Sequence, residues 1–222
     1  MKTLIRKLPH FIDFLNKPRG LLNENGYANI ETDQETKNLI KSIFKYSMHS
    51  NGTTGLYQNK LKPDRKILKK IINKIEWQSG NILKKYLGYY SIDICYEHIS
   101  IFKKQIHRDS QLWHHDSVGR RIKIFLNMDE SCSSGTLFEI NSHKISNISK
   151  INVPKEERLS YKPKNKIIEL KPTINNICLF DTNSMHKGIN GQPGEKRHLI
   201  VIELSNPLKS LTRGKVGKRN RL

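Results

Sequence analysis

The stretch Trp113-His114-His115-Asp116, together with the short apolar segments around it, decides the fold class that this sequence predicts. His114 and Asp116 are separated by one residue, and side chains two positions apart project from the same side of an extended strand. An imidazole and a carboxylate would therefore face one point. The same spacing also occurs by chance, so its meaning depends on the segments that follow.

Outward from this stretch, the chain after Tyr90 alternates short apolar runs with turns. The predicted strands are 92–102, 121–128, 136–140, 166–170, 176–181 and 198–204. Many short strands separated by turns are typical of a β-sandwich or barrel. The polar and basic stretch 141–165 shows no clear period and is predicted to be a long surface insertion.

The first ninety residues predict helices instead. Thr32 and Glu35 form a capping-box pattern ahead of an apolar stripe. Pro63-Asp64 opens a second amphipathic helix, and 81–87 predicts a shorter one. We therefore expect a mostly β, α+β protein. Its predicted parts are a helical segment 1–90 packed on the barrel, a β core 91–204 that contains the insertion 141–165, and a basic tail 205–222.

His186 is the candidate for a third ligand beside His114 and Asp116. It follows the apolar segment 177–180 and so stands where a strand ends. Closure of a barrel would bring it alongside the other two residues. Two histidines and one carboxylate hold a non-haem iron(II) on one face and leave its other positions open. These three residues are the predicted metal ligands and catalytic centre.

Arg197 is the candidate for binding an organic co-substrate. 2-Oxoglutarate chelates iron through its 2-oxo acid and leaves a second carboxylate to be anchored. A guanidinium suits this task because it forms two hydrogen bonds to a carboxylate and stays charged. Arg197 lies eleven residues after His186, at the start of an apolar strand, so it can face the same cavity.

Together these segments resemble the phytanoyl-CoA dioxygenase superfamily, which includes the ectoine hydroxylases. The similar part runs from about Ile92 to Leu204, roughly half of the chain. The matching residues are Trp113, His114, Asp116, Gly135, Ser142, His143, Lys144, Phe180, Asp181, Met185, His186 and Arg197. One departure is Ile140-Asn141, which stands where the family usually has Pro-Gly and changes the expected shape of that loop.

The resemblance implies a double-stranded β-helix, a cupin-like jelly-roll barrel with iron at its mouth. It implies that His114, Asp116 and His186 bind Fe(II) and that Arg197 binds 2-oxoglutarate. The implied reaction uses O2 to hydroxylate an unidentified substrate, expected to be a small molecule, with release of succinate and carbon dioxide.

Two further residues are candidates for contacts with the co-substrate. The residue at the position of His115 often contacts the co-substrate in relatives of this family, and His115 could do so here or could compete as a ligand. Lys123 shares a strand face with Asn127 and would point into the barrel if that face is the inner one. Asp116 argues against a halogenase, since halide requires that a small residue vacate the carboxylate position.

The charge of the chain raises the question of an anionic partner. Forty Lys and Arg against twenty Asp and Glu give a formal charge of +20, which attracts nucleic acid and acidic membranes. Abundant Lys, Asn and Ile also fit AT-rich coding, so a nucleic-acid partner is not favoured. Alkylated-base demethylases usually carry a second Arg six residues after the anchor, where this chain has Glu203.

Two alternatives stay open beside a small-molecule hydroxylase: an oxygenase directed at nucleic acid, and a non-catalytic basic jelly-roll binding module. The intact set of ligands and anchor argues against the second. The oligomeric state is left open by the sequence.

No apolar run approaches the ~20 residues that a membrane span needs, and residues 1–16 lack the features of a secretory signal. We expect that N-terminal stretch to pack on the domain, with a membrane-surface helix as the alternative. Cys95, Cys132 and Cys178 form no C-x-x-C pair, which predicts a reducing, cytoplasmic compartment.

Overall fold

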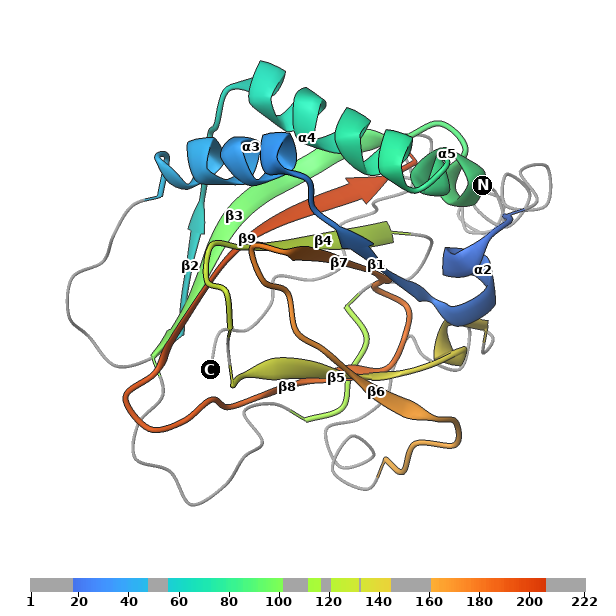
Figure 1. Ribbon diagram of the computed structural model, residues 1–222. Coiled ribbons are helices and arrows are strands. Elements are labelled where there is room, and N and C mark those ends of the chain that lie inside the picture. Colours follow the sequence, from blue (N-terminus) through green and yellow to red (C-terminus); the bar gives the residue numbers. More distant parts are fainter. Residues whose placement is uncertain are drawn as a thin grey trace, which may run out of the picture.

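In the computed structural model, the strands form two antiparallel sheets that face each other (Figure 1). The structure describes residues 18–47, 56–101, 112–116, 121–131, 133–144 and 161–206. The larger sheet has the strand order β1-β7-β4-β9-β3-β2, and the smaller sheet has the order β6-β5-β8. The strands are β1 (Tyr27–Glu31), β2 (Leu56–Lys60), β3 (Ser91–Ile101), β4 (Arg121–Asn127), β5 (Gly135–Glu139), β6 (Ile167–Leu170), β7 (Asn176–Asp181), β8 (His186–Ile189) and β9 (Lys196–Ser205).

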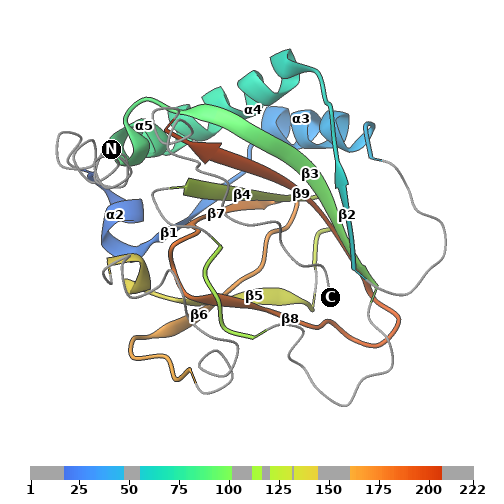
Figure 2. The same ribbon diagram turned by 180° about the vertical axis from the view of Figure 1, so that it is seen from behind.

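Helices cover the outer face of the larger sheet, as both views along the sheets show (Figures 1 and 2). The helical elements are α2 (Leu21–Asn25), α3 (Gln34–Phe44), α4 (Arg65–Gln78), α5 (Ile82–Leu87) and the short 3-10 turn η1 (Ser142–Lys144). The protein therefore has three layers: helices, a large sheet and a small sheet. None of the helices in the described ranges is long and apolar enough to cross a membrane.

The strand period of two assigns opposite roles to the two faces of β4. Ile122, Ile124 and Leu126 are fully buried and join a core with the apolar faces of α3, α4 and α5. Phe125 belongs to a second core, between the two sheets, which also contains Phe138 of β5 and aliphatic residues of β9. The space between the sheets therefore holds this second apolar core together with polar side chains such as Lys123 and Arg197.

Capping residues fix where the two long helices begin. Asp33 is the N-cap of α3 and accepts a hydrogen bond from the Thr36 N–H at 2.7 Å. The predicted capping box at Thr32 is therefore wrong by one residue, because the Thr32 hydroxyl donates to the Ile174 carbonyl instead. Asp64 caps α4, as the sequence predicted, by accepting from the Lys66 N–H.

The segment predicted to be helical also contributes strands. β1 pairs with β7, and β2 pairs with β3, so residues before position 90 form both edges of the larger sheet. Both strands are only five residues long, which explains why the sequence did not indicate them. Each depends on a partner from the later half of the chain.

The six strands predicted after Tyr90 are all present, as β3, β4, β5, β6, β7 and β9. β8 was not predicted as a strand. Of the insertion 141–165, only its two ends, 141–144 and 161–165, lie within the described residues. Residues 1–17, Cys132 and the tail from 207 onward lie outside them. Cys95 and Cys178 are free and buried.

Replacing Ile124 by Ala tests the helix-facing core. Ile124 is fully buried between β7 and β9, and the cavity left by the substitution should lower the free energy of unfolding by about 2–5 kcal/mol. Ile167→Ala, at a position 43% exposed on β6, should cost less than about 1 kcal/mol. Urea unfolding followed by circular dichroism compares the two, and equal losses would contradict this account of the core.

Candidate metal centre

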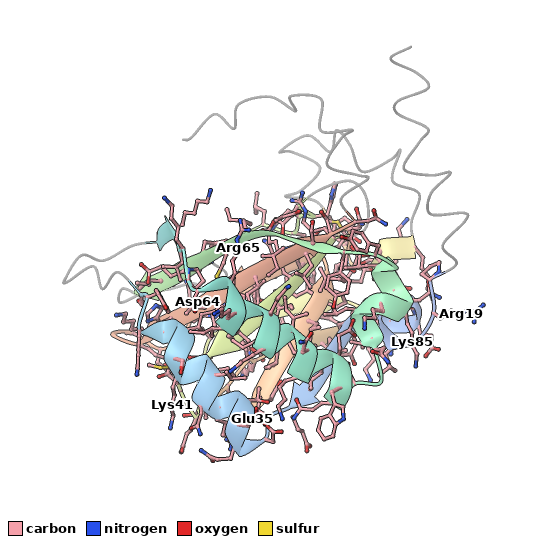
Figure 3. The ribbon with its side chains drawn as sticks, turned by 90° about the horizontal axis from the view of Figure 1, so that it is seen from above. Arg19, Glu35, Lys41, Asp64, Arg65 and Lys85 are labelled. Atoms are coloured by element: carbon pink, nitrogen blue, oxygen red, sulfur yellow. The ribbon has the colours of Figure 1, made fainter. Side chains whose placement is uncertain are left out.

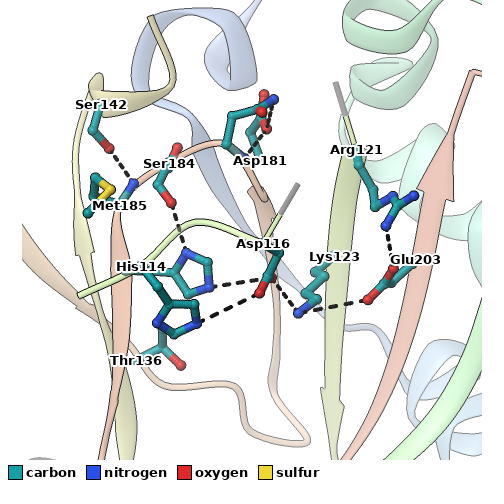
Figure 4. Close-up of polar contacts among 12 residues, drawn as sticks. His114, Asp116, Arg121, Lys123, Thr136, Ser142, Asp181, Ser184, Met185 and Glu203 are labelled. Atoms are coloured by element: carbon teal, nitrogen blue, oxygen red, sulfur yellow. Dashed lines mark hydrogen bonds and ion pairs between the residues drawn. The ribbon is translucent and has the colours of Figure 1, made fainter. Parts of the chain in front are cut away.

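Two neighbouring side chains and a third about seventy residues later in the sequence meet between the two sheets (Figure 4). His114, Asp116 and His186 each offer one ligand atom, and these atoms all lie within 4.8 Å of one another. The Asp116 Oδ1 lies 3.7 Å from the His114 Nε2, and its Oδ2 lies 3.5 Å from the His186 Nε2. This is the grouping that the H-x-D spacing and the distant histidine predicted.

Backbone hydrogen bonds place these three residues. The His114 N–H donates to the His186 carbonyl at 2.9 Å, and the His186 N–H donates back to the His114 carbonyl at 2.8 Å. The two histidines thus form an isolated antiparallel bridge. The Asp116 N–H donates to the Thr182 carbonyl at 2.9 Å. This bond positions the Asp116 carboxylate near the two histidine rings.

The tautomer of each histidine follows from its partner. The Nδ1 of His114 lies 2.7 Å from the Leu112 carbonyl, and the Nδ1 of His186 lies 2.8 Å from the Ser184 carbonyl. A carbonyl only accepts hydrogen bonds, so both Nδ1 atoms carry the proton. Both Nε2 atoms therefore face Asp116, and in the neutral tautomer each would offer the lone pair that a metal requires.

The charge state of the site also suits a cation. Burial lowers the pKa of His114 to about 4, and the neighbouring His186 contributes to the shift. Burial alone would raise the pKa of Asp116, but His186 and Lys123 together hold it well below its usual value. His114 is therefore neutral and Asp116 charged near neutral pH. Two imidazoles and one carboxylate on one face match the donor set of non-haem iron(II).

Lys123 is the nearest cation to this group. Its Nζ lies 2.6 Å from the Asp116 Oδ2 and 3.8 Å from Glu203. Glu203 in turn pairs with Arg121 at 3.3 Å, so charges alternate across adjacent strands β4 and β9. The face of β4 that carries Lys123 is the inner one, so Lys123 points into the barrel, which was one of the two possibilities that the sequence left open. It contacts the candidate metal carboxylate, and its contact with a co-substrate stays a prediction.

Arg197 lies inside the same barrel. Its guanidinium donates to the Gly135 carbonyl and to the Thr136 Oγ1, both at 3.3 Å, and lies 5.8 Å from the centre of the Phe125 ring. Thr136 pairs with Gly188, two residues after His186, so the hydroxyl that Arg197 contacts lies on the same face of the smaller sheet as His186. Arg197 is only 6% exposed, which contradicts a solvated surface role.

His98 lies near Arg197 and Lys123, which the sequence did not indicate. It lies on β3, where it is partly buried. Burial lowers its pKa to about 3, and the nearby charges of Arg197 and Lys123 act in the same direction. An uncharged imidazole therefore stands within electrostatic reach of both cations. The position of His98 in the sequence did not indicate this location. It becomes apparent only from the pairing of β3 with β9.

Asp181 organises the loop that precedes His186. Its carboxylate accepts hydrogen bonds from the Asn183 N–H at 2.7 Å, from the Asn183 Nδ2 at 2.9 Å and from the Tyr86 hydroxyl. Ser142 accepts from the Met185 N–H at 2.8 Å and donates to the Glu139 carbonyl. The loop 182–185 is thus tied at both ends, as expected of a turn residue rather than a catalytic one.

Gly26 allows the N-terminal segment to approach this loop. Its φ of 83° is in the left-handed region, and its carbonyl accepts from the Asp181 N–H at 2.8 Å. A Cβ at this position would lie 2.6 Å from the His143 Nδ1 and 2.8 Å from the Ser184 Oγ. The Ser-His-Lys element, predicted to be structural for its histidine, therefore packs against α2 and the ligand loop.

The remaining candidates lie apart from the metal group. His115, between two ligands, is not one of the three residues that meet, and its co-substrate contact stays a prediction. Trp113 lies 6.1 Å from the ring of Tyr161 and 5.5 Å from the Lys187 Nζ. Lys187 pairs with Leu137 on the face of the smaller sheet opposite His186. Trp113 thus packs outside the barrel rather than forming the pocket wall.

Sequence comparisons do not identify the chain. No protein-family model matches it, and no curated protein matches it. The similarity found is therefore one of structure.

Many solved structures match the fold. EvdMO1 matches with a TM-score of 0.58 at 14% identity over 84% of this chain, which spans 48% of EvdMO1. The epimerase SnoN, solved with Fe3+, α-ketoglutarate and nogalamycin RO, matches with a TM-score of 0.57 at 9% identity over 100% of this chain and 94% of its own. HygX from Streptomyces hygroscopicus, with nickel, 2-oxoglutarate and hygromycin B, matches with a TM-score of 0.52 at 10% identity over 83% and 84%. The chain therefore shares the fold of 2-oxoglutarate-binding non-haem enzymes.

The depressed pKa of His98 predicts a pH effect on stability. In the unfolded chain His98 titrates near its ordinary value of 6.5, and in the folded protein near 3. The unfolded state binds the proton first, so this group lowers stability as the pH falls through 6.5 toward 3. Between pH 7 and pH 5, His98→Gln should lose about 2 kcal/mol less of its unfolding free energy than wild type. Urea titrations at both pH values measure this, and parallel losses would contradict it.

Proposed function

We propose that this protein is an iron(II)- and 2-oxoglutarate-dependent dioxygenase that hydroxylates a small molecule. The observation that carries the proposal is the facial group of His114, Asp116 and His186. Both Nδ1 atoms are occupied by carbonyls, and both Nε2 atoms are turned toward one carboxylate. The shared fold with enzymes solved with iron or nickel and 2-oxoglutarate supports it.

The described residues fit both the metal and the co-substrate. His114, Asp116 and His186 would hold Fe(II) on one face and leave sites for 2-oxoglutarate and O2. Arg197 would bind the far carboxylate of 2-oxoglutarate, with Thr136 beside it as a hydroxyl partner. The guanidinium now donates to one carbonyl and one hydroxyl at 3.3 Å, which are long hydrogen bonds, so a carboxylate would be a stronger partner.

Bound iron, O2 and 2-oxoglutarate together supply the oxidising power for hydroxylation, with succinate and carbon dioxide as co-products. The chain supplies geometry. The paired backbone hydrogen bonds between His114 and His186 fix two ligands relative to each other. Lys123 binds the Asp116 Oδ2, so it orients that carboxylate and limits its freedom to rotate. Phe180, 5.1 Å from the His186 ring, helps keep water from the inner side of the site.

A small-molecule substrate is supported by two of the structural neighbours. HygX was solved with hygromycin B, and SnoN with nogalamycin RO. SnoN is an epimerase, so the fold also supports oxidations that do not end in a hydroxyl group. Hydroxylation and membership of the phytanoyl-CoA dioxygenase superfamily rest on the motif residues from Trp113 to Arg197, and a cytoplasmic location rests on the scattered cysteines.

Succinate formation from 2-oxoglutarate, with iron(II), ascorbate and air, tests the proposal. The wild-type protein should show slow turnover even without its prime substrate, and His186→Ala should abolish it because one of three ligands is lost. Lys187→Ala is the matched control, since its side chain lies on the other face of β8 and the rate should be preserved. No succinate from the wild type, with no metal or 2-oxoglutarate binding by calorimetry, would overturn the proposal.

Arg197→Met tests the assigned anchor. Loss of a charged hydrogen bond of about 1.5–3 kcal/mol should raise the KM for 2-oxoglutarate roughly 10- to 100-fold. Metal affinity should change little, because Arg197 is not among the ligands. Lys196→Met removes the same charge from the exposed neighbouring position and should leave the KM within about twofold of wild type. An unchanged KM in Arg197→Met would remove Arg197 from the site.

A further inference from the structure

The outer surface of α4 and α5 is strongly basic, and the exposed acid at its edge is Asp64, the N-cap of α4. The only acidic residue within the two helices is Glu76, which is 4% exposed. Its carboxylate accepts from the Leu83 and Lys84 N–H groups, both at 3.0 Å, and from the Tyr90 hydroxyl at 2.9 Å. Glu76 therefore joins the helices internally. We call the exposed set Arg65, Lys66, Lys69, Lys70, Trp77, Lys84, Lys85 and Tyr89 the α4–α5 face.

This concentration of charge is local and does not simply follow the composition of the chain. The segment 19–45 contains four basic residues and four acidic ones. At the border between α3 and α4, Lys74 is paired with Asp33 at 3.4 Å and with Glu35. The acids of α3 thus neutralise the edge of the neighbouring helix and leave the α4–α5 face strongly basic.

Two large aromatic side chains stand exposed within this face. Trp77 is 75% exposed and Tyr89 is 74% exposed. Lys66, Lys70 and Trp77 lie on one side of α4, because positions four and eleven apart fall close together around a helix. Tyr89 precedes Tyr90, which is bonded to Glu76 at the end of α4, so the two exposed aromatic residues share one end of the face.

The face is broad and lies away from the metal centre. Viewed from above, α3 and α4 run side by side across the larger sheet, with α5 continuing beyond α4 (Figure 3). The smaller sheet lies on the opposite side of the larger sheet from these helices (Figure 1). The metal group lies on that side, because His186 belongs to β8 of the smaller sheet and Asp116 contacts Lys123 of β4. A partner on the helices would therefore not cover it.

We propose that the α4–α5 face docks on an anionic phospholipid surface. Lysine and arginine side chains near such a surface are attracted by its negative potential. Trp and Tyr bury their rings at the headgroup level while their polar atoms stay in water, and exposed aromatic residues at a basic rim suit that environment. A planar layer of two adjacent helices suits a membrane plane better than a nucleic-acid groove, which admits a single protruding helix. This inference is independent of the proposed catalytic function.

Co-sedimentation of the full chain with vesicles tests it. Vesicles of equal parts phosphatidylcholine and phosphatidylserine should bind the protein, and pure phosphatidylcholine vesicles should not. The double variant Lys66→Glu/Lys70→Glu should weaken binding at least about tenfold, since attraction becomes repulsion at two positions. The matched control is Lys162→Glu/Lys166→Glu, which makes the same change at exposed positions flanking the smaller sheet and should alter binding less than about threefold.

Equal losses of vesicle binding in the two double variants would show that only the overall charge attracts the protein, and would overturn the proposal of a specific face. Failure of the wild type to bind anionic vesicles would overturn it as well. Circular dichroism of each variant checks folding, which substitutions at exposed positions should preserve.

Fluorescence gives a second readout. Trp77 should shift its emission to shorter wavelength on anionic vesicles, and Trp77→Phe should remove the shift because Trp113, the other tryptophan, is only 8% exposed. An unshifted wild type would contradict contact of Trp77 with lipid. Tighter binding to a DNA duplex than to vesicles, lost in Lys66→Glu/Lys70→Glu, would replace the membrane by nucleic acid as partner.

Discussion

The central constraint on this structure is a carboxylate held between the two sheets. Asp116 has its side chain 16% exposed, and such a charge is costly unless it is paired or binds a metal. Lys123 supplies one partner at 2.6 Å, and the Nε2 atoms of two imidazoles face it from the other side. With a metal ion between them, the carboxylate and both Nε2 lone pairs would each have a cation as partner. The arrangement therefore suits metal binding.

A polar interior between the sheets must be supported elsewhere. The large apolar core lies on the other side of the six-stranded sheet, against α3, α4 and α5, where Ile122, Ile124 and Leu126 are fully buried. Their neighbours Lys123 and Phe125 face the opposite way into the barrel. One face of β4 thus contributes to the stabilising core, and the other face contributes Lys123 to the candidate site. The helices strengthen the scaffold from the side of the larger sheet opposite Arg197 and the metal group.

The same division explains what the sequence could predict. The long strands β3, β4 and β9 carry strong apolar patterns, and the ligands His114, Asp116 and His186 stand at recognisable places beside them. The edge strands β1 and β2 were missed because each has only five residues and depends on pairing with β7 or β3. His98 was missed for a related reason: its role comes from its neighbours across the sheet, and sequence spacing does not encode those.

Contacts across long sequence distances also make the early helices part of the site. Tyr86 of α5 donates its hydroxyl proton to Asp181, and Gly26 accepts the Asp181 N–H. Asp181 begins the loop that ends at His186, so the position of one candidate ligand depends on residues a hundred or more positions earlier. A helical segment that only packed on a finished barrel would not need these bonds. The first ninety residues are thus better understood as part of the scaffold that sets the ligand geometry than as a separate attachment.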